Sequence, residues 1–263
     1  MSRVLLPWTA PYDVPGLLDF LGMRAVPGVE EVFDGGYRRA VAGRVMEVRA
    51  ADGGFLVDER DTRSAQALLD LDMDPFVIKN VLGVASVTNM DPHRTLIRDG
   101  RIGRRVPGTT SPEELAFRAV LGQQVSVAGA RTLTGRLVHA FGAPLSHPVG
   151  AVTHAFPTAA AFAEVNPDTL PMPKARGRAF VNLAKELADG LDLHDREKLL
   201  SLPGIGPWTA DYIAFRALGD RDAWLPTDLG VKHAMKNLGL TNADADRWRP
   251  YRAYAIVHLW AST

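Results

Sequence analysis

The sequence predicts an α+β protein in which an N-terminal antiparallel sheet domain with helices is followed by a two-lobed, all-α body. Three observations support this fold class. Two glycine-containing hairpin turns fall within the first 72 residues, helix-start signals recur from Asp74 onward, and a glycine-rich turn at 202–206 separates two helical stretches. The chain of 263 residues, 46% of them hydrophobic, is long enough for two or three small domains.

The first 72 residues combine β-prone runs with two helices. The turns DGG at 34–36 and ADGG at 51–54 each separate two runs that favour strands. These runs cover residues 31–33, 37–41, 44–50 and 55–58. Helices are expected over 14–24 and 62–71. The pattern predicts a small antiparallel sheet with helices on one side.

The rest of the chain shows repeated helix-start signals. A capping residue precedes proline at Asp74, Asp91 and Asn166. The run SPEE at 111–114 predicts a capping box, with proline at the first helical position. Further helices are expected over residues 127–141, 175–188, 196–201, 207–218, 229–238 and 250–260.

Composition excludes several kinds of site. Cysteine is absent, which excludes disulfides, cysteine-ligated zinc and a thiolate-held iron–sulfur cluster. The seven histidines include no HExxH-like pair, so we expect no zinc site. No apolar run approaches the roughly 20 residues of a membrane span, and the N-terminus lacks signal-peptide features. We therefore expect no membrane partner and a cytoplasmic location.

The charge balance bears on nucleic acid as one class of partner. Thirty basic residues match thirty acidic ones, which argues against a coat that contacts many phosphates. A few phosphates could still be held by backbone amides and a local basic face. The clusters RIGRR at 101–105 and KARGR at 174–178 could supply that face, or could be solvated surface.

The segment LPGIGPWTA at 202–210 is the most specific motif. Gly204 and Gly206 allow backbone conformations and close approaches that a Cβ would block. The N–H groups of Trp208 and Thr209 fall at a helix N-terminus, where they would be unpaired and could bind an anion such as a DNA phosphate. The alternative interpretation is a corner between two helices that binds no ligand.

Asp228 lies one helix and one loop beyond this turn, at the start of another predicted helix. Aspartate is a common helix cap, so a purely structural role is one interpretation. The other is a carboxylate at the mouth of a pocket, which stabilises an oxocarbenium-like sugar and orients the attacking water.

Together these motifs resemble the bacterial 3-methyladenine DNA glycosylase II family, within the helix-hairpin-helix glycosylase superfamily. The resemblance covers nearly the whole length. The matching segments are residues 11–13, 20–26, 119–128, 202–212, 225–232 and 247–260. The family fold implies a mixed α+β domain over 1–73 and two helical lobes. One lobe, 74–110 with 221–263, carries the acid, and the other, 111–220, carries the hairpin.

The resemblance also implies roles for individual residues. Asp228 would be the catalytic acid, and Trp208, Tyr212, Trp260 and Phe20 would form the walls of a base pocket. Aromatic faces suit an alkylated purine, because alkylation at N3 or N7 leaves the base cationic. Packing between helices is the alternative role for these aromatic residues.

Trp208 bears on the type of reaction. Related bifunctional glycosylases place a lysine at this position and use it as a Schiff-base nucleophile. Trp208 provides no amine, so the expected reaction is hydrolysis that releases the base without cutting the strand.

Three positions differ from the usual family pattern. The wedge that fills the DNA stack after base flipping is commonly leucine, and here it would be Gln124, preceded by Gln123. Both glutamines could instead hydrogen-bond at a helix end. Thr227 stands where an acid is frequent, and Leu229 stands where a pocket aromatic can occur, which suggests a wider pocket.

The family further implies a structural Na⁺ or K⁺ held by the backbone carbonyls of Leu200, Leu202 and Ile205. We expect a monomeric bacterial enzyme that acts at the nucleoid on double-stranded DNA containing 3-methyladenine or 7-methylguanine.

Two other functions stay open. One is a non-catalytic helix-hairpin-helix module that binds DNA, and the other is a glycosylase for the deaminated bases uracil or hypoxanthine. Asp228 favours an enzyme, because a binding module has no reason to keep an acid beside phosphates.

Overall fold

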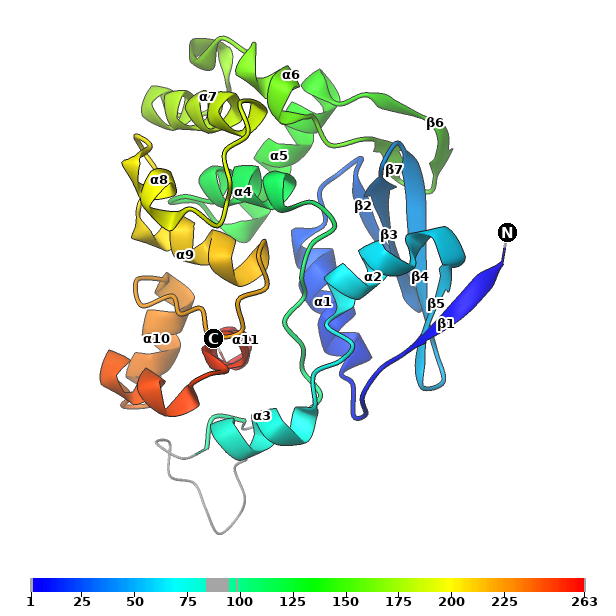
Figure 1. Ribbon diagram of the computed structural model, residues 1–263, viewed down its shortest axis with the longest axis vertical. Coiled ribbons are helices and arrows are strands. Elements are labelled where there is room, and N and C mark those ends of the chain that lie inside the picture. Colours follow the sequence, from blue (N-terminus) through cyan, green and yellow to red (C-terminus); the bar gives the residue numbers. More distant parts are fainter. Residues whose placement is uncertain (1, 84–94, 98, 263) are drawn as a thin grey trace.

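The N-terminal domain is built on one antiparallel sheet, and the computed structural model describes residues 2–83, 95–97 and 99–262 (Figure 1). Five strands pair in the order β1-β5-β4-β3-β2. Their bounds are β1 Arg3–Pro7, β2 Glu30–Phe33, β3 Gly36–Val41, β4 Arg44–Ala51 and β5 Gly54–Asp58. Both predicted hairpins, β2 with β3 and β4 with β5, are confirmed. Strand β1 was not predicted from the sequence, and its pairing with β5 reveals it.

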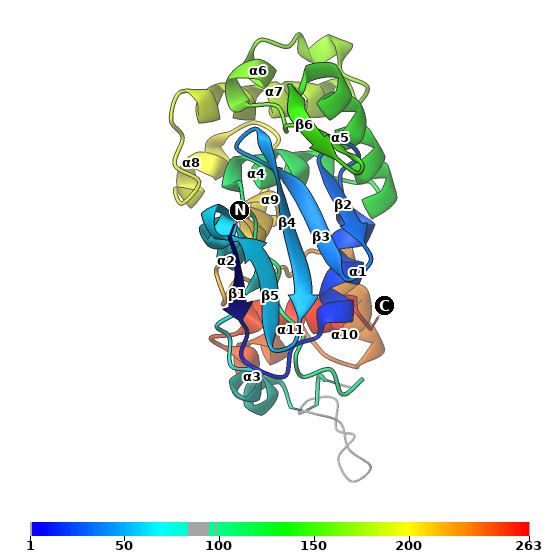
Figure 2. The same cartoon turned by 90° about the vertical axis from the view of Figure 1, so that its right-hand side faces the viewer.

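Two helices cover the face of this sheet that looks toward the helical body (Figures 1 and 2). Helix α1 (Val14–Arg24) has the predicted bounds, and Asp13 caps it by accepting the Gly16 N–H at 3.0 Å. Helix α2 (Thr62–Leu69) follows the short 3₁₀ turn η1 (Glu59–Asp61). It ends two residues before the predicted end because Asp70 adopts a left-handed conformation, with φ of 48°.

The expected α+β class is confirmed, and the helices of the body begin close to their predicted starts. Their bounds are α3 Pro75–Leu82, α4 Pro112–Leu121, α5 Val127–Phe141, α6 Ala159–Ala163, η2 Pro167–Thr169, α7 Lys174–Ala188, α8 Arg196–Ser201, α9 Pro207–Arg216, α10 Leu229–Asn237, η3 Asn242–Trp248 and α11 Arg252–Trp260. Asn166 caps a 3₁₀ turn rather than an α-helix. The predicted start at Asp91 lies outside the described residues. None of the helices in the described part of the chain is long and apolar enough to cross a membrane.

A two-stranded ribbon adds to the expected helical body. Strands β6 (Pro144–Val149) and β7 (Val152–His154) pair antiparallel, and the Gly28 carbonyl accepts the N–H groups of Thr153 and His154 at 2.8 and 2.9 Å. The sequence pattern does not reveal this ribbon, since its irregular register breaks the alternation of apolar and polar residues. Contacts with the N-terminal domain hold it in place.

Buried apolar side chains form three large clusters. One lies between the sheet and helices α1 and α2, a second within α4 to α9, and a third within α3, α10 and α11. Tyr212 packs against the second and third clusters, so it marks the place where they meet. We propose these clusters as the cores of the three lobes implied by the family resemblance.

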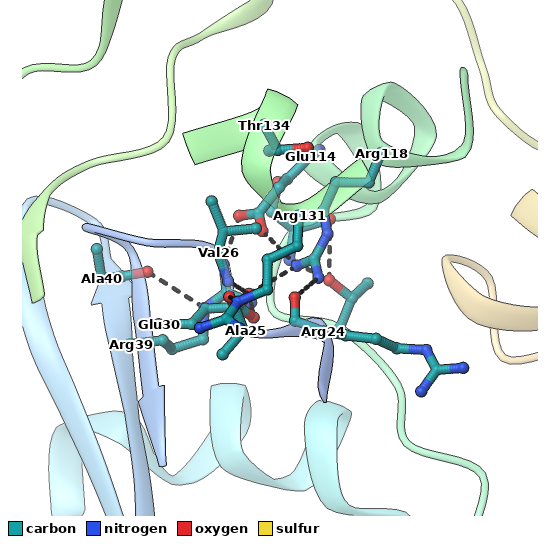
Figure 3. Close-up of polar contacts among 12 residues, drawn as sticks. Arg24, Ala25, Val26, Glu30, Arg39, Ala40, Glu114, Arg118, Arg131 and Thr134 are labelled. Carbon is teal, nitrogen blue, oxygen red and sulfur yellow. Dashed lines mark hydrogen bonds and ion pairs between the residues drawn. The ribbon is translucent and has the colours of Figure 1, made fainter. Parts of the chain in front are cut away.

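A buried ion network joins the sheet to the helical body (Figure 3). Arg39 on β3 binds Glu30 at 3.4 Å and also forms an ion pair with Glu114 on α4. Arg118, one turn further along α4, donates to Glu30 at 3.0 Å and to Glu114 at 3.1 Å. Although burial raises the pKa of Glu30, Arg118 and Arg39 hold it below its usual value. Tyr37 donates a further hydrogen bond to Glu30 at 2.6 Å.

This network corrects the capping box predicted at 111–114. The Ser111 hydroxyl does accept the Glu114 N–H at 3.2 Å. The Glu114 carboxylate does not return to the N–H of Ser111, which donates to Thr109 instead. Glu114 binds Arg39 and Arg118, because an ion pair in the buried interface between lobes is stronger than a hydrogen bond at a helix end.

Removal of Arg39 should destabilise the protein strongly. In Arg39→Met, Glu30 and Glu114 lose a buried partner, which should lower the free energy of unfolding by about 3–5 kcal/mol. Urea unfolding measures this change. The matched control is Arg49→Met on β4, because Arg49 is 43% exposed and its pair with Glu47 should contribute about 1 kcal/mol or less. Equal losses in the two variants would contradict the assignment.

A second buried group predicts how stability depends on pH. His258 on α11 is 3% exposed, and its Nδ1 lies 3.4 Å from the Arg104 guanidinium. Burial, with a contribution from Arg104, lowers the pKa of His258 to about 3. The native state therefore keeps this histidine neutral at pH values where the unfolded chain, with a pKa of about 6.5, binds a proton.

The unfolded chain binds the extra proton below pH 6.5, so stability should fall as the pH drops from 6.5 toward 3. The slope should be up to about 1.4 kcal/mol per pH unit. His258→Gln should remove this contribution, and His147→Gln, which changes an exposed histidine, should retain it. Urea unfolding between pH 7 and pH 4 measures the slopes. The same slope in all three proteins would refute the role of His258.

Candidate active site

A cleft of about 430 Å³ lies where α1, α4, α5, α9, α10 and α11 meet. It receives Asp228 from α10, Trp260 from α11, and Trp208 and Tyr212 from α9. Four of the residues that the resemblance assigns to the site therefore face one cavity. Trp208 lies 20 positions before Asp228 and Trp260 lies 32 positions after it, so only the tertiary fold could show that these side chains meet.

Asp228 acts as a helix cap and also faces the cleft. Its Oδ1 accepts the Val231 N–H at 3.0 Å, which caps α10, and the Trp260 indole N–H at 2.8 Å. Its Oδ2 accepts the Trp208 indole N–H at 3.1 Å. The structural and functional interpretations of Asp228 are therefore compatible. Three N–H donors fix the orientation of the carboxylate in the cleft.

The aromatic residues form two stacks. Trp208 stacks on Tyr212 with ring centroids 5.1 Å apart and an interplanar angle of 25°. Trp260 stacks on Phe20 at 6.3 Å and 21°. Phe20 does not line the cleft, contrary to the role implied for it. It lies behind Trp260 beside a neighbouring cavity, because α1 turns this residue toward Arg216, whose guanidinium carbon is 4.7 Å from its ring centroid.

Arginines are the feature of the cleft that the sequence interpretation missed. Among the described residues, four arginines line it, namely Arg24, Arg118, Arg131 and Arg216. Arg216 donates to the Pro107 carbonyl at 2.8 Å, and burial lowers its pKa to about 10 although nearby Tyr212 raises it. Arginine is common on helix surfaces, so spacing alone gives no signal that these four side chains converge.

The hairpin places its two glycines in different environments. Gly204 has φ of +86°, and a Cβ there would lie 2.5 Å from the Cβ of Ala179 on α7. Gly206 has no heavy atom within 4 Å of such a Cβ and has φ of −99°. Close packing of the hairpin on α7 therefore requires glycine at 204 and not at 206.

One expectation for the hairpin is wrong. The N–H of Thr209 is not available for a phosphate, because it donates to the Gly206 carbonyl at 3.0 Å and the residue is buried. The first turn of α9 closes tightly and uses this donor. Trp208, which begins the same turn, directs its side chain to Asp228.

The two glutamines before α5 have different environments. Gln123 donates from Nε2 to the Gly204 carbonyl at 2.9 Å and to the Thr209 hydroxyl at 3.0 Å, which ties its loop to the hairpin. Gln124 is exposed at the tip of that loop and has φ of 56°, a conformation that costs energy for a residue with a Cβ. Of these two glutamines, Gln124 is the one whose side chain is exposed, as the wedge role requires.

Leu229 does not widen the cleft. It is 70% exposed at the first position of α10 and does not line the cavity. Among the described residues there is also no group of three His, Asp or Glu side chains that could hold a metal ion.

The alkali cation remains a prediction. Leu200 lies in the last turn of α8, where carbonyls lack partners within the helix, so it fits a cation site. The Leu202 carbonyl already accepts the Ile205 N–H at 3.0 Å and has one lone pair left for an ion.

The two basic clusters have different environments. In the first, Arg105 is buried and donates to the Thr9 carbonyl at 2.5 Å, while Arg104 pairs with Asp99 at 2.9 Å, so this cluster is structural. In the second, Arg176 and Arg178 line surface grooves. The groove at Arg178 includes Gly204, so this cluster lies beside the hairpin.

Solved structures show the class of this fold. The 3-methyladenine DNA-glycosylase from Archaeoglobus fulgidus superposes with a TM-score of 0.79, at 21% identity, over 99% of this chain and 98% of that chain. The apo-form of an 8-oxoguanine glycosylase/lyase from Clostridium acetobutylicum gives 0.76 at 16% identity, over 100% and 97%. The chain therefore has the fold of the helix-hairpin-helix DNA glycosylases.

Sequence relatives narrow the class to a family. Residues 3–111 match the AlkA N-terminal domain. DNA-3-methyladenine glycosylase 2 of Escherichia coli is 32% identical over 97% of this chain and 95% of its own length. The probable bifunctional transcriptional activator/DNA repair enzyme AlkA of Mycobacterium tuberculosis is 43% identical over 98% of this chain. The chain spans 56% of the length of that mycobacterial relative. It belongs to the DNA-3-methyladenine glycosylase 2 (AlkA) family.

The glycine environments give a matched pair of substitutions. Gly204→Ala should lower the free energy of unfolding by about 2–3 kcal/mol, because it adds both backbone strain and a clash with α7. It should also weaken binding of duplex DNA. Gly206→Ala should cost less than about 1 kcal/mol, the usual difference between these residues at a helix N-cap. Urea unfolding and fluorescence anisotropy with a labelled duplex test both. Similar effects at the two positions would show that the contact of Gly204 with α7 does not matter.

Proposed function

We propose that this chain is a monofunctional DNA N-glycosylase that excises alkylated purines such as 3-methyladenine and 7-methylguanine. The observation that carries the proposal is Asp228, whose carboxylate is held in the cleft by the indole N–H groups of Trp208 and Trp260. The family membership of the chain supports the same reaction.

The reaction begins when the damaged nucleotide turns out of the duplex into the cleft. Asp228 stabilises the positive charge that develops on the sugar as the bond between C1′ and the base nitrogen breaks. The carboxylate also orients a water, whose oxygen adds to C1′ while its proton passes to solvent. An alkylated purine carries a positive charge and leaves as a neutral base, so its departure needs no strong general acid.

The lining of the cleft supports hydrolysis without strand cleavage. Formation of a Schiff base requires an amine that can reach C1′. The cleft residues that the structure describes include no lysine. At the hairpin position Trp208 offers an indole instead, and its N–H already donates to Asp228.

The proposed partner is double-stranded DNA, bound by a monomer at the nucleoid in the bacterial cytoplasm. The hairpin with Gly204 and Gly206 would hold a backbone phosphate. The exposed side chain of Gln124 would enter the stack and occupy the space left by the flipped base, while Gln123 anchors the loop. Arg178, in the groove that includes Gly204, and Arg176, in a groove beside the start of α5, would add phosphate contacts.

Substitution of Asp228 tests the function. Asp228→Asn should reduce release of 3-methyladenine and 7-methylguanine from methylated duplex DNA by about 10²–10³-fold, since the charge that stabilises the transition state is lost. Asparagine is an equally good helix cap, but its NH2 group cannot accept the Trp208 indole N–H, so the free energy of unfolding should fall by about 1–3 kcal/mol at most and the variant should stay folded at assay temperature. Chromatography of the released bases measures the rate.

The wild type should leave abasic sites that break only after alkali is added. Unchanged release by Asp228→Asn would contradict the role of this acid. Wild-type protein that binds the duplex and releases no base would instead support the non-catalytic binding module.

A further inference from the structure

Two surface grooves that border α7 are lined by basic side chains. One, of about 500 Å³, lies between α5 and the start of α7 and includes Arg136 and Arg176. We call it the α5 groove. The other, of about 510 Å³, includes Arg178 and Lys185 of α7 together with Gly204 of the hairpin, and we call it the hairpin groove. Among the residues that the structure describes, no aspartate or glutamate lines either groove.

The basic side chains of these grooves have no partner of their own within the described part of the chain. Helix α7 contains a single acid, Glu186, and that carboxylate pairs with Lys198 at 3.0 Å. The described cations that make neither an ion pair nor a side-chain hydrogen bond are Arg63, Lys79, Arg136, Lys174, Arg176, Arg178, Lys185, Lys232 and Lys236. Five of these nine belong to α5 or α7. The positive charge that remains unpaired in this neutral chain is therefore concentrated on two helices.

The spacing of Arg178 and Lys185 suits the backbone of one DNA strand. Seven residues make nearly two helical turns, so both side chains lie on the same face of α7 and are about 10 Å apart along its axis. A strand of duplex DNA carries one charge per about 3.4 Å of helix axis, so the two cations would contact different phosphates. Gly204 in the same groove belongs to the hairpin, which would hold a further phosphate. The hairpin groove therefore continues the path of the strand that the hairpin holds.

The α5 groove adjoins the cleft. Val125, the residue after Gln124, lines both the cleft and this groove. DNA held at Arg136 and Arg176 would therefore lie beside the loop that carries the wedge residue. Charge complementarity and continuity with the hairpin and the wedge loop favour the same occupant for both grooves.

We propose that the two grooves form a lesion-independent binding surface for the phosphate backbone of duplex DNA, which holds undamaged DNA while a damaged base is sought. The inference rests on the proposed glycosylase function and extends the DNA contact beyond the cleft and the hairpin. Contacts to phosphates carry no sequence information, so this surface should bind DNA equally well with and without a lesion.

The salt dependence of binding to an undamaged duplex tests this surface. Each phosphate contact contributes about 0.9 to the slope of log affinity against log salt concentration. We expect the double variant Arg178→Met with Lys185→Met to bind more weakly and to lower the slope by about 2, because two contacts are lost. Arg136→Met with Arg176→Met should have an effect of the same size. Fluorescence anisotropy of a labelled duplex between about 50 and 200 mM salt measures the slopes.

The matched control removes the same two charges elsewhere. Arg63→Met with Lys79→Met changes one arginine and one lysine, both exposed and without an ion pair, on α2 and α3. Its slope should equal that of the wild type. In single-turnover release of 7-methylguanine, the groove variants should require a higher protein concentration for the half-maximal rate, and circular dichroism should show that they are folded.

The outcomes separate this inference from the glycosylase function. An unchanged slope in a folded groove variant would overturn the inference for that groove, and an equal fall in slope in the control would show that net charge alone is responsible. Either result leaves the glycosylase function standing if the wild type releases 7-methylguanine and Asp228→Asn does not. A wild type that releases no base, with slopes that fall only in the groove variants, would overturn the glycosylase function and support the binding surface.

Discussion

The buried ion network of Glu30, Arg39, Glu114 and Arg118 is the constraint on which the cleft depends. Buried charges are costly unless every one is paired, so this network fixes one docking geometry between the sheet and α4. The same Arg118 donates to the Arg24 carbonyl at 2.7 Å, which holds the end of α1 at the cleft. Helix α4 then leads directly into the glutamine loop and, through it, to the hairpin. One network therefore helps to position α4, the loop of Gln123 and Gln124 that follows it, and the end of α1.

Asp228 and its two indole partners behave as one unit. A carboxylate that only capped α10 would need one backbone donor, and this one accepts two further N–H groups from Trp208 and Trp260. Trp208 and Trp260 therefore orient the Asp228 carboxylate and also line the cavity. Substitution of either tryptophan would alter the acid as well as the wall, which makes these residues poor probes of base stacking alone.

The cleft combines aromatic faces with guanidinium groups, and the chain as a whole is electrically neutral. Many arginines are paired with acids, as in the network and in the pair of Arg104 with Asp99. Other arginines lie in surface grooves, Arg178 in one that includes Gly204 of the hairpin and Arg176 in one beside the start of α5. Net charge alone gives no indication of this distribution, because it sums over pairs that cancel in space.

The sequence alone determined the elements whose signals are local. The two glycine turns defined the hairpins, residues 14–24 were expected as the helix that became α1, and the motif at 202–210 defined the helix-hairpin-helix turn. Tertiary structure decided the rest, since it depends on partners far away in the chain. Strand β1 and the β6–β7 ribbon exist because of their pairing partners. The Glu114 carboxylate forms an ion pair with Arg39 in the interface and does not complete a capping box, and Phe20 stacks behind Trp260. Convergence of arginines on one cleft has no local pattern, because each comes from a different helix, and only their packing brings the charges together.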